Sequence, residues 1–511
     1  MLIVALFLIA FAALAFIWFL WPPFDLDFWV EFWIFILTIV PALTLSALHL
    51  AHAKRWWAKS LSVIPALLGL AILGGVAWSW LWLRDIGASI ELLAVPENPA
   101  VPERRLHLAW LQLESTADEP GPPIVYLAGG PGGGGTLTLA LSGRYPVFDA
   151  MRQIADVIVL DQRGTMPWND PWLICPNTWS HTLDEPMTGA TLLAAQAASL
   201  PECLTYFEDD VDLSAWHTDA NADDIDALRQ ALGADRVTLW GTSYGSHLAL
   251  AYLKKYPDNV HRMILHGIEG LDDTLKLPSD VDAAIDHLTQ LADSDLAADI
   301  AQVLAGLEAA PVTVALEDEP PVTIGVYDAQ LFLALRLRSG STRSTIPRAV
   351  ARMLEGDFEQ VARFSLNVRQ GRRDSLMALA MDCASGASTA RIERVSVESA
   401  TSLLGDVINH PFPDICASVP HTDLGSGFRE PLTSAVPALL ISGTQDGRTP
   451  VSNAERVLQG LPNGQHLIID GAGHGDELFV SSPDILRAML AFLRDEPLPA
   501  TRIKVPFAFD S

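Results

Sequence analysis

Val237-Thr-Leu-Trp240 runs directly into Gly241-Thr-Ser-Tyr-Gly245, and the apolar run Leu248-Ala-Leu-Ala-Tyr-Leu253 follows. A short strand, a serine with glycines two positions before and after it, and a helix together make a nucleophile elbow. In such a turn Ser243 stands above the edge of a sheet, and a Cβ at either glycine would crowd it. The N–H of Tyr244 then faces a developing oxyanion at the start of the helix. A chance glycine-rich turn is the rival interpretation, and the flanking strand and helix make it the weaker one.

An acidic residue and a histidine follow two later strands. The apolar stretch 437–442 precedes Asp446, and the stretch 466–469 precedes His474. Serine, acid and histidine is the chain order that this architecture uses. We therefore predict that His474 takes the proton of Ser243 and that Asp446 orients the imidazole. Solvated surface residues are the alternative, which the two matching strand ends disfavour.

A second glycine-rich stretch, at 128–135, follows an apolar strand. Glycine allows close backbone approach, and its N–H groups can point into a cavity. The stretch lacks the Gly-Lys-Ser/Thr ending of a phosphate loop, so we reject phosphate binding and weigh a flexible turn against an oxyanion loop. We predict that the N–H of Gly130 is the second oxyanion donor, beside that of Tyr244. Asp161 and Arg163, after another buried strand, are expected to form a structural pair that braces these loops.

The pattern along the chain indicates an α/β fold. Short apolar strands alternate with helical segments, which predicts a mostly parallel sheet with helices on both faces. From 271 to 435 strand signals are few, and helical segments dominate. We expect residues 91–270 and 436–511 to form the two parts of the core, and 271–435 to form a helical cap over the carboxyl ends of the strands.

Residues 1–90 contain three apolar blocks, at about 2–21, 28–50 and 61–83. Each reaches the roughly 20 residues that a membrane-spanning helix needs, so we expect three transmembrane helices before the fold. A cleaved signal peptide is the alternative for the first block, which lacks a basic start and a small-residue cleavage site. The loop at 52–59 is basic and that at 22–27 acidic. The positive-inside rule then predicts a multi-pass protein in the lipid bilayer, with a cytoplasmic N-terminus and an extracytoplasmic or periplasmic domain.

The formal net charge is −28, from 61 acidic and 33 basic residues. Acidic and basic residues balance within 1–90, so the excess belongs to residues 91–511. A domain this acidic is expected to be well solvated and to have no nucleic-acid partner.

All four cysteines lie in this acidic part: Cys175, Cys203, Cys383 and Cys416. Three pairings are possible. We favour Cys175–Cys203 and Cys383–Cys416, because each closes a modest loop and because disulfides persist outside the cytoplasm. Four free buried thiols are the alternative. The spacing does not suggest a metal site, and we expect neither a metal nor a cofactor.

These motifs resemble the α/β-hydrolase fold and, within it, the prolyl iminopeptidase and tripeptidyl aminopeptidase group of serine peptidases. The resemblance covers about residues 90 to 495 and is carried by five stretches: 129–133, 161–164, 241–245, 443–450 and 473–475. Ala128 stands where the iminopeptidases usually have histidine, which is closer to the tripeptidyl branch.

The resemblance implies hydrolysis of a peptide bond near a free N-terminus, through an acyl-serine intermediate. It also implies that cap carboxylates hold the substrate ammonium. Glu269, Asp272 and Asp273 lie where the cap begins and are the candidates, and the sequence does not choose among them.

The expected function is therefore that of a membrane-anchored serine aminopeptidase acting on a peptide or small acyl substrate. An esterase or lipase-like hydrolase with the same triad is the main alternative. A catalytically silent membrane receptor on the same fold is a further one, which the presence of Ser243, Asp446 and His474 disfavours.

Overall fold

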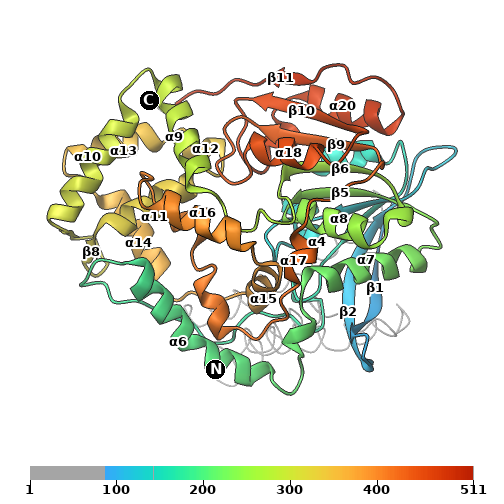
Figure 1. The fold of residues 1–511 in the computed structure, drawn as a ribbon, viewed down its shortest axis with the longest axis horizontal. Helices are drawn as coiled ribbons and strands as arrows, with labels where there is room; N and C mark the ends of the chain where they lie inside the picture. The colour runs from blue at the N-terminus through green and yellow to red at the C-terminus, as the bar shows by residue number, and fades with distance from the viewer. Residues whose placement is uncertain (1–86, 142, 510–511) are drawn as a thin grey trace, which may run out of the picture. The chain divides into compact units, whose positions relative to one another are not determined.

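The protein is described from a computed structural model, whose described residues are 87–141 and 143–509 (Figure 1). The three apolar blocks at 2–21, 28–50 and 61–83 lie outside these residues. Across the described ranges, no helix has both the length and the apolar character needed to cross a bilayer. The account below concerns the compact unit that begins at Ile90.

A nine-stranded sheet forms the centre of this unit (Figure 1). The strands lie in the order β1-β2-β4-β3-β5-β6-β9-β10-β11. From β4 to β11 neighbouring strands are parallel, whereas β2 runs antiparallel to β4. The strands are β1 Ala88–Asn98, β2 Val101–Leu113, β3 Ile124–Leu127, β4 Val157–Leu160, β5 Val237–Ser243, β6 Val260–Ile268, β9 Ala438–Gly443, β10 Gly464–Asp470 and β11 Arg502–Lys504. The predicted mostly parallel sheet is confirmed.

Helices cover both faces of the sheet. Successive side chains on a strand point to opposite faces, so neighbouring residues of β5 pack against different helices. On β5, Leu239 belongs to the apolar core that includes α7 (Thr218–Ala231) and α8 (Tyr244–Lys255). The next residue, Trp240, packs against Phe148 of α5 (Tyr145–Met151), with 4.6 Å between ring centroids. The remaining helices of this part are α4 Gly135–Leu141, α18 Val451–Leu458, α19 Glu477–Val480 and α20 Pro483–Leu493.

A long insertion separates two neighbouring strands, β6 and β9. It is mostly helical, with one antiparallel pair of short strands, β7 Val312–Val314 and β8 Val322–Ile324. Its helices are α9 Pro278–Ala292, α10 Leu296–Ala309, α11 Val326–Arg336, α12 Gly340–Arg343, α13 Ile346–Leu354, α14 Glu359–Arg369, α15 Leu376–Ser385, α16 Thr389–Ser399 and α17 Gly425–Arg429. Many of its buried residues form an apolar core of their own, distinct from the core around β5 and α8. In Figure 1, α10, α11, α13 and α14 group together beside the sheet.

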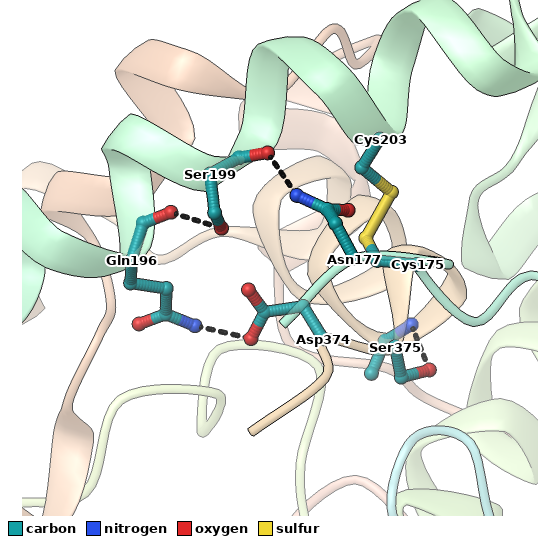
Figure 2. The surroundings of a disulfide bond; sticks show 8 residues. Cys175, Asn177, Gln196, Ser199, Cys203, Asp374 and Ser375 are labelled. Carbon is teal, nitrogen blue, oxygen red and sulfur yellow. Dashed lines mark hydrogen bonds between the residues drawn. A yellow bond between two sulfur atoms is a disulfide. The ribbon is translucent and has the colours of Figure 1, made fainter. Parts of the chain in front are cut away.

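One part of the expected core, near 174–200, packs on the insertion instead. Trp179 and Arg372 exchange two backbone hydrogen bonds. The Gln196 amide of α6 (Gly189–Phe207) donates to Asp374 at 2.7 Å, as Figure 2 shows. Met187 and Leu192 belong to the apolar core of the insertion. The helical insertion therefore packs against a second stretch of chain that lies outside the 271–435 boundaries expected for the cap.

Both favoured disulfides are present. Cys175 is bonded to Cys203 of α6, and Cys383 of α15 is bonded to Cys416. Figure 2 shows the first bond beside the contacts of α6 with Asp374. Each bond holds together segments whose cysteines are 28 and 33 residues apart, respectively.

Candidate active site

The site begins with the backbone around Ser243, where β5 ends and α8 starts. Ser243 has φ 54° and ψ −125°, a left-handed conformation that a side chain rarely adopts and that often marks functional strain. A Cβ at Gly241 would lie 2.3 Å from the carbonyl oxygen of Gly245, and one at Gly245 would lie 2.0 Å from that of Leu127. Both glycines are therefore required by the close approach of strand, turn and helix, as a nucleophile elbow demands.

Three side chains from distant parts of the chain meet at this turn. His474 Nε2 lies 3.0 Å from Ser243 Oγ, and His474 Nδ1 lies 2.8 Å from Asp446 Oδ2. Asp446 follows β9 and His474 follows β10, and these strands are parallel neighbours, so their carboxyl ends lie side by side. The structure thus brings Ser243, His474 and Asp446 into one hydrogen-bonded chain.

Asp446 is held by its own loop as well as by the histidine. The backbone N–H groups of Arg448 and Thr449 each donate to Asp446 Oδ1 at 2.8 Å, and the Thr449 hydroxyl donates to Oδ2 at 2.6 Å. Burial alone would raise the pKa of the Asp446 carboxyl, but the charge of His474 and these hydrogen bonds outweigh it and lower the pKa. A carboxylate held in its ionised form can fix the imidazole tautomer and stabilise an imidazolium.

The glycine-rich loop lies against the serine. A Cβ on Gly129 would come within 2.8 Å of the Ser243 Cβ, so only glycine permits this approach. The next residue, Gly130, has φ +133°, and its N–H has no hydrogen-bond partner among the described residues. Tyr244 is the first residue of α8, where backbone N–H groups lack intrahelical acceptors. The positions of Gly130 and Tyr244 are compatible with the expected oxyanion donors.

Asp161 and Arg163 do not form the pair that the sequence suggested. Asp161 instead accepts from the N–H of Thr136 at 3.0 Å and from its hydroxyl at 2.6 Å, at the start of α4. Arg163 makes a two-pronged ion pair with Asp224 of α7, at 2.7 and 2.8 Å. Gln162, between them, donates to the carbonyl of Ala128 at 2.8 Å. The motif still braces the loops near the site, through three separate anchors.

Of the three candidate carboxylates, Glu269 is linked to the backbone of the nucleophile through Ser246. Its N–H donates to Ser246 Oγ at 2.9 Å, and that hydroxyl donates to the Ser243 carbonyl at 2.6 Å. The Glu269 carboxylate is not free, however, because the Lys276 ammonium lies 2.7 Å from it.

Asp272 and Asp273 make structural contacts instead. Asp272 accepts from the N–H and hydroxyl of Ser388, the N-cap of α16, at 2.6 and 2.7 Å. Asp273 pairs with Arg391 at 2.6 Å and with Arg456 at 3.0 Å. Both aspartates line a cavity of about 530 Å³ whose lining includes neither Ser243 nor His474. These contacts join the cap to the core, and they leave neither carboxylate available to a substrate amine.

Two further charged residues near the site were not found from the sequence. Asp382 of α15 has no hydrogen bond or ion pair to its carboxyl within the described part of the chain. Burial, followed by the negative charge of Glu269, raises the pKa of Asp382 well above its usual range, and Lys276 and Arg448 oppose that rise. Asp382 stands one residue before Cys383, and Arg448 stands two after Asp446. Asp382 belongs to no recognised motif, and within the 443–450 stretch only Asp446 was given a role, so neither charged residue was singled out from the sequence.

Comparison with known families matches residues 122–478 to the family described as alpha/beta hydrolase fold. The chain belongs to the α/β-hydrolase family. The matched region runs from the start of β3 to α19 and includes Ser243, Asp446, His474 and the whole insertion.

Similarity to individual proteins is more local. The serine protease Hip1 of Mycobacterium tuberculosis is 48% identical over 46 residues, which is 9% of each chain. A proline iminopeptidase of Xylella fastidiosa is 28% identical over 163 residues, or 31% of this chain and 36% of that one. A solved esterase of Thermogutta terrifontis is 16% identical, with a TM-score of 0.35, over 79% of this chain and 98% of that one. The chain thus spans well under half the length of these two curated relatives.

Proposed function

We propose that this α/β-hydrolase is a membrane-anchored serine aminopeptidase, which releases N-terminal amino acids or short peptides through an acyl-serine intermediate. The observation that carries the proposal is the hydrogen-bonded chain Ser243–His474–Asp446 at a strained elbow. The local similarity to a serine protease and to proline iminopeptidases supports a peptide substrate.

In the proposed reaction, Ser243 Oγ attacks the carbonyl carbon of the scissile bond while His474 Nε2 takes the hydroxyl proton. The carbonyl oxygen becomes an oxyanion, to which the N–H groups of Gly130 and Tyr244 donate. The imidazolium then gives its proton to the leaving amine, and the C–N bond breaks. Water, deprotonated by His474, attacks the acyl-serine, and the product acid leaves with Ser243 restored.

The free amine of the substrate would be held by Asp382, with Glu269 beside it. Asp382 has no hydrogen-bond or ion-pair partner among the described residues. Burial and the charge of Glu269 raise its pKa against the opposing charges of Lys276 and Arg448, and an incoming ammonium would favour its ionised form. Asp382→Asn is therefore expected to raise KM for substrates with a free amine.

A second candidate is an esterase, and the pairing of Glu269 with Lys276 favours it, because this acid is already neutralised. Aminoacyl and tripeptidyl anilides, each with a free or an acetylated α-amine, separate the two functions. A loss of about 100-fold or more in kcat/KM on acetylation, the scale of a lost hydrogen-bonded charge pair, supports the aminopeptidase. Equal rates on both forms support the ester hydrolase.

Membrane attachment through residues 1–90 and an extracytoplasmic catalytic domain are part of the same proposal. The apolar blocks in the sequence and the two disulfides support it, because disulfides persist outside the reducing cytoplasm. A reporter enzyme fused after residue 90 tests the topology, since activity of a cytoplasm-only reporter would overturn it.

The catalytic part is tested by Ser243→Ala in the full-length protein. Removing the hydroxyl is expected to lower kcat by several orders of magnitude and to leave only residual catalysis. Near-normal hydrolysis by this variant, in a folded preparation with both disulfides formed, would overturn the proposal.

A further inference from the structure

Two arginines border the triad without a carboxylate partner. We propose that Arg448 and Arg338 bind a carboxylate of the substrate beside the scissile bond. This inference rests on the proposed peptidase function and specifies the substrates that the site prefers.

Arg448 is fixed to the catalytic loop by its backbone. Its N–H donates to Asp446 Oδ1 at 2.8 Å, and the following residue, Thr449, contacts both Asp446 and His474. Arg448 is a half-buried residue, and its guanidinium has no hydrogen bond or ion pair within residues 87–141 and 143–509. An arginine held in this way next to a catalytic acid has donors left over for a ligand.

Arg338 lies in the helical insertion and contacts the triad through its backbone. It lies between α11 and α12, and its carbonyl accepts the N–H of His474 at 2.9 Å. Its side chain is exposed, and in the described part of the chain it has no ion-pair partner. Burial, and then the charge of Arg338, lower the pKa of Arg448, and the charges of Glu269, Asp446 and Asp382 oppose that fall. No carboxylate of the described residues is in ion-pair contact with either guanidinium, so the donors of both are left for a carboxylate of a ligand.

The carboxylates nearby do not balance these arginines. Glu269 forms an ion pair with Lys276 at 2.7 Å, and Asp446 is hydrogen-bonded to His474. Asp382 is biased toward its neutral form by its raised pKa. Near the triad there are therefore three cationic side chains (Lys276, Arg338 and Arg448) and two ionised carboxylates, both already paired (Glu269 and Asp446). The remaining positive charge suits an anion, and a guanidinium fork matches the geometry of a carboxylate.

A peptide offers a carboxylate from two sources. One is an acidic side chain on the N-terminal residue, whose ammonium would lie at Asp382. The other is the free C-terminus of a short peptide. The two sources share the same chemistry at the arginines and are separated by the substrates used in the test.

The experiment measures kcat/KM of the full-length protein for two matched substrate pairs. The first pair is the anilides of glutamate and glutamine, and the second is a short neutral peptide with a free or an amidated C-terminus. The wild type is expected to prefer the anionic member of at least one pair by about tenfold or more, the scale of a charge-assisted hydrogen bond. Which pair shows the preference identifies the source of the carboxylate.

The variants are Arg448→Gln, Arg448→Lys and Arg338→Gln. Arg448→Gln and Arg338→Gln are each expected to reduce the preference about tenfold, mainly through KM, and Arg448→Lys to keep part of it because the charge remains. Arg236→Gln is the matched control: this exposed arginine precedes β5, at the opposite end of the strand from Ser243. The control is expected to leave the preference unchanged.

The results separate this inference from the function on which it rests. If the wild type cleaves these substrates without preferring the anionic members, or if both glutamine variants keep the preference, the carboxylate site is wrong and the peptidase stands. If the wild type cleaves none of the four, the peptidase proposal fails and the inference falls with it. Because Arg338 is exposed, Arg338→Gln remains informative even if Arg448→Gln does not fold.

Discussion

The Thr449 hydroxyl donates a 2.6 Å hydrogen bond to Asp446 Oδ2, the same oxygen that lies 2.8 Å from His474 Nδ1. The hydroxyl is also 3.0 Å from His474 Nδ1. Thr449 is therefore a positioning residue for both members of the acid–base pair, and it helps to keep the pKa of Asp446 low.

Thr449→Val is expected to lower kcat by about tenfold or more, because a hydrogen bond to a charged group contributes roughly 1.5–3 kcal/mol. Without this bond the pKa of Asp446 rises, so the loss of activity that follows protonation of this carboxyl should begin at a higher pH. Thr449→Ser keeps the hydroxyl and should recover most of the activity. A valine variant with an unchanged profile and rate would show that the contact is incidental.

The glycines of the elbow should tolerate no side chain. Gly245→Ala places a Cβ 2.0 Å from the carbonyl oxygen of Leu127, so we expect loss of soluble, folded protein or of nearly all activity. Gly306→Ala is the matched control. This glycine lies within α10, has no atoms within 4 Å of the added Cβ, and should gain about 0.5–1 kcal/mol of stability. Equal urea midpoints and rates for both variants would contradict the packing described here.

The bond between Cys175 and Cys203 should stabilise the docking of α6 on the cap. Its loop spans 28 residues, so replacing both cysteines by alanine is expected to cost about 3–4 kcal/mol in the free energy of unfolding. Limited proteolysis should then cut first between residues 171 and 207. An unfolding midpoint and a cleavage pattern that match the wild type would contradict this assignment.

A buried histidine should make the fold sensitive to acid. His266 contacts the Leu478 carbonyl at 3.0 Å and stacks on Phe479, and burial followed by the charge of Arg144 lowers its pKa to about 3. The unfolded chain, with a histidine pKa near 6.5, binds the proton first as pH falls. Stability from this residue is therefore complete above about pH 6.5 and is lost at about 1.4 kcal/mol per pH unit below it.

His266→Asn removes this titration, and its free energy of unfolding should fall less than that of the wild type between pH 7 and pH 5. The difference between the two changes is expected to be about 2 kcal/mol. Urea unfolding at several pH values gives this difference, and parallel curves would contradict the assignment.

The strands and the triad could be predicted because each has a local signal. Every residue of β3 and β4 is buried, which leaves apolar runs in the sequence, and Ser243, Asp446 and His474 each follow such a run. Parallel strands have their carboxyl ends at the same edge of the sheet, so residues that follow these strands lie close together.

The charged surroundings of the triad could not be predicted in the same way. Whether Glu269 or Asp273 is free depends on Lys276 in the same loop, and on Arg391 of α16 and Arg456 of α18, which are distant in the sequence. The packing of the stretch before α6 on the insertion likewise depends on backbone pairing between Trp179 and Arg372, which any two residues could make. Contacts of this kind leave no periodicity or motif in the chain.

The central claim is that His474 activates the hydroxyl of Ser243. A fluorophosphonate probe tests it most directly, because it phosphonylates only an activated serine, and mass spectrometry of the digested protein locates the adduct. The account predicts one adduct, on Ser243, in the wild type, and labelling slowed by orders of magnitude in His474→Ala. Absence of label on Ser243 in folded wild-type protein, or equally fast labelling without the histidine, would contradict it.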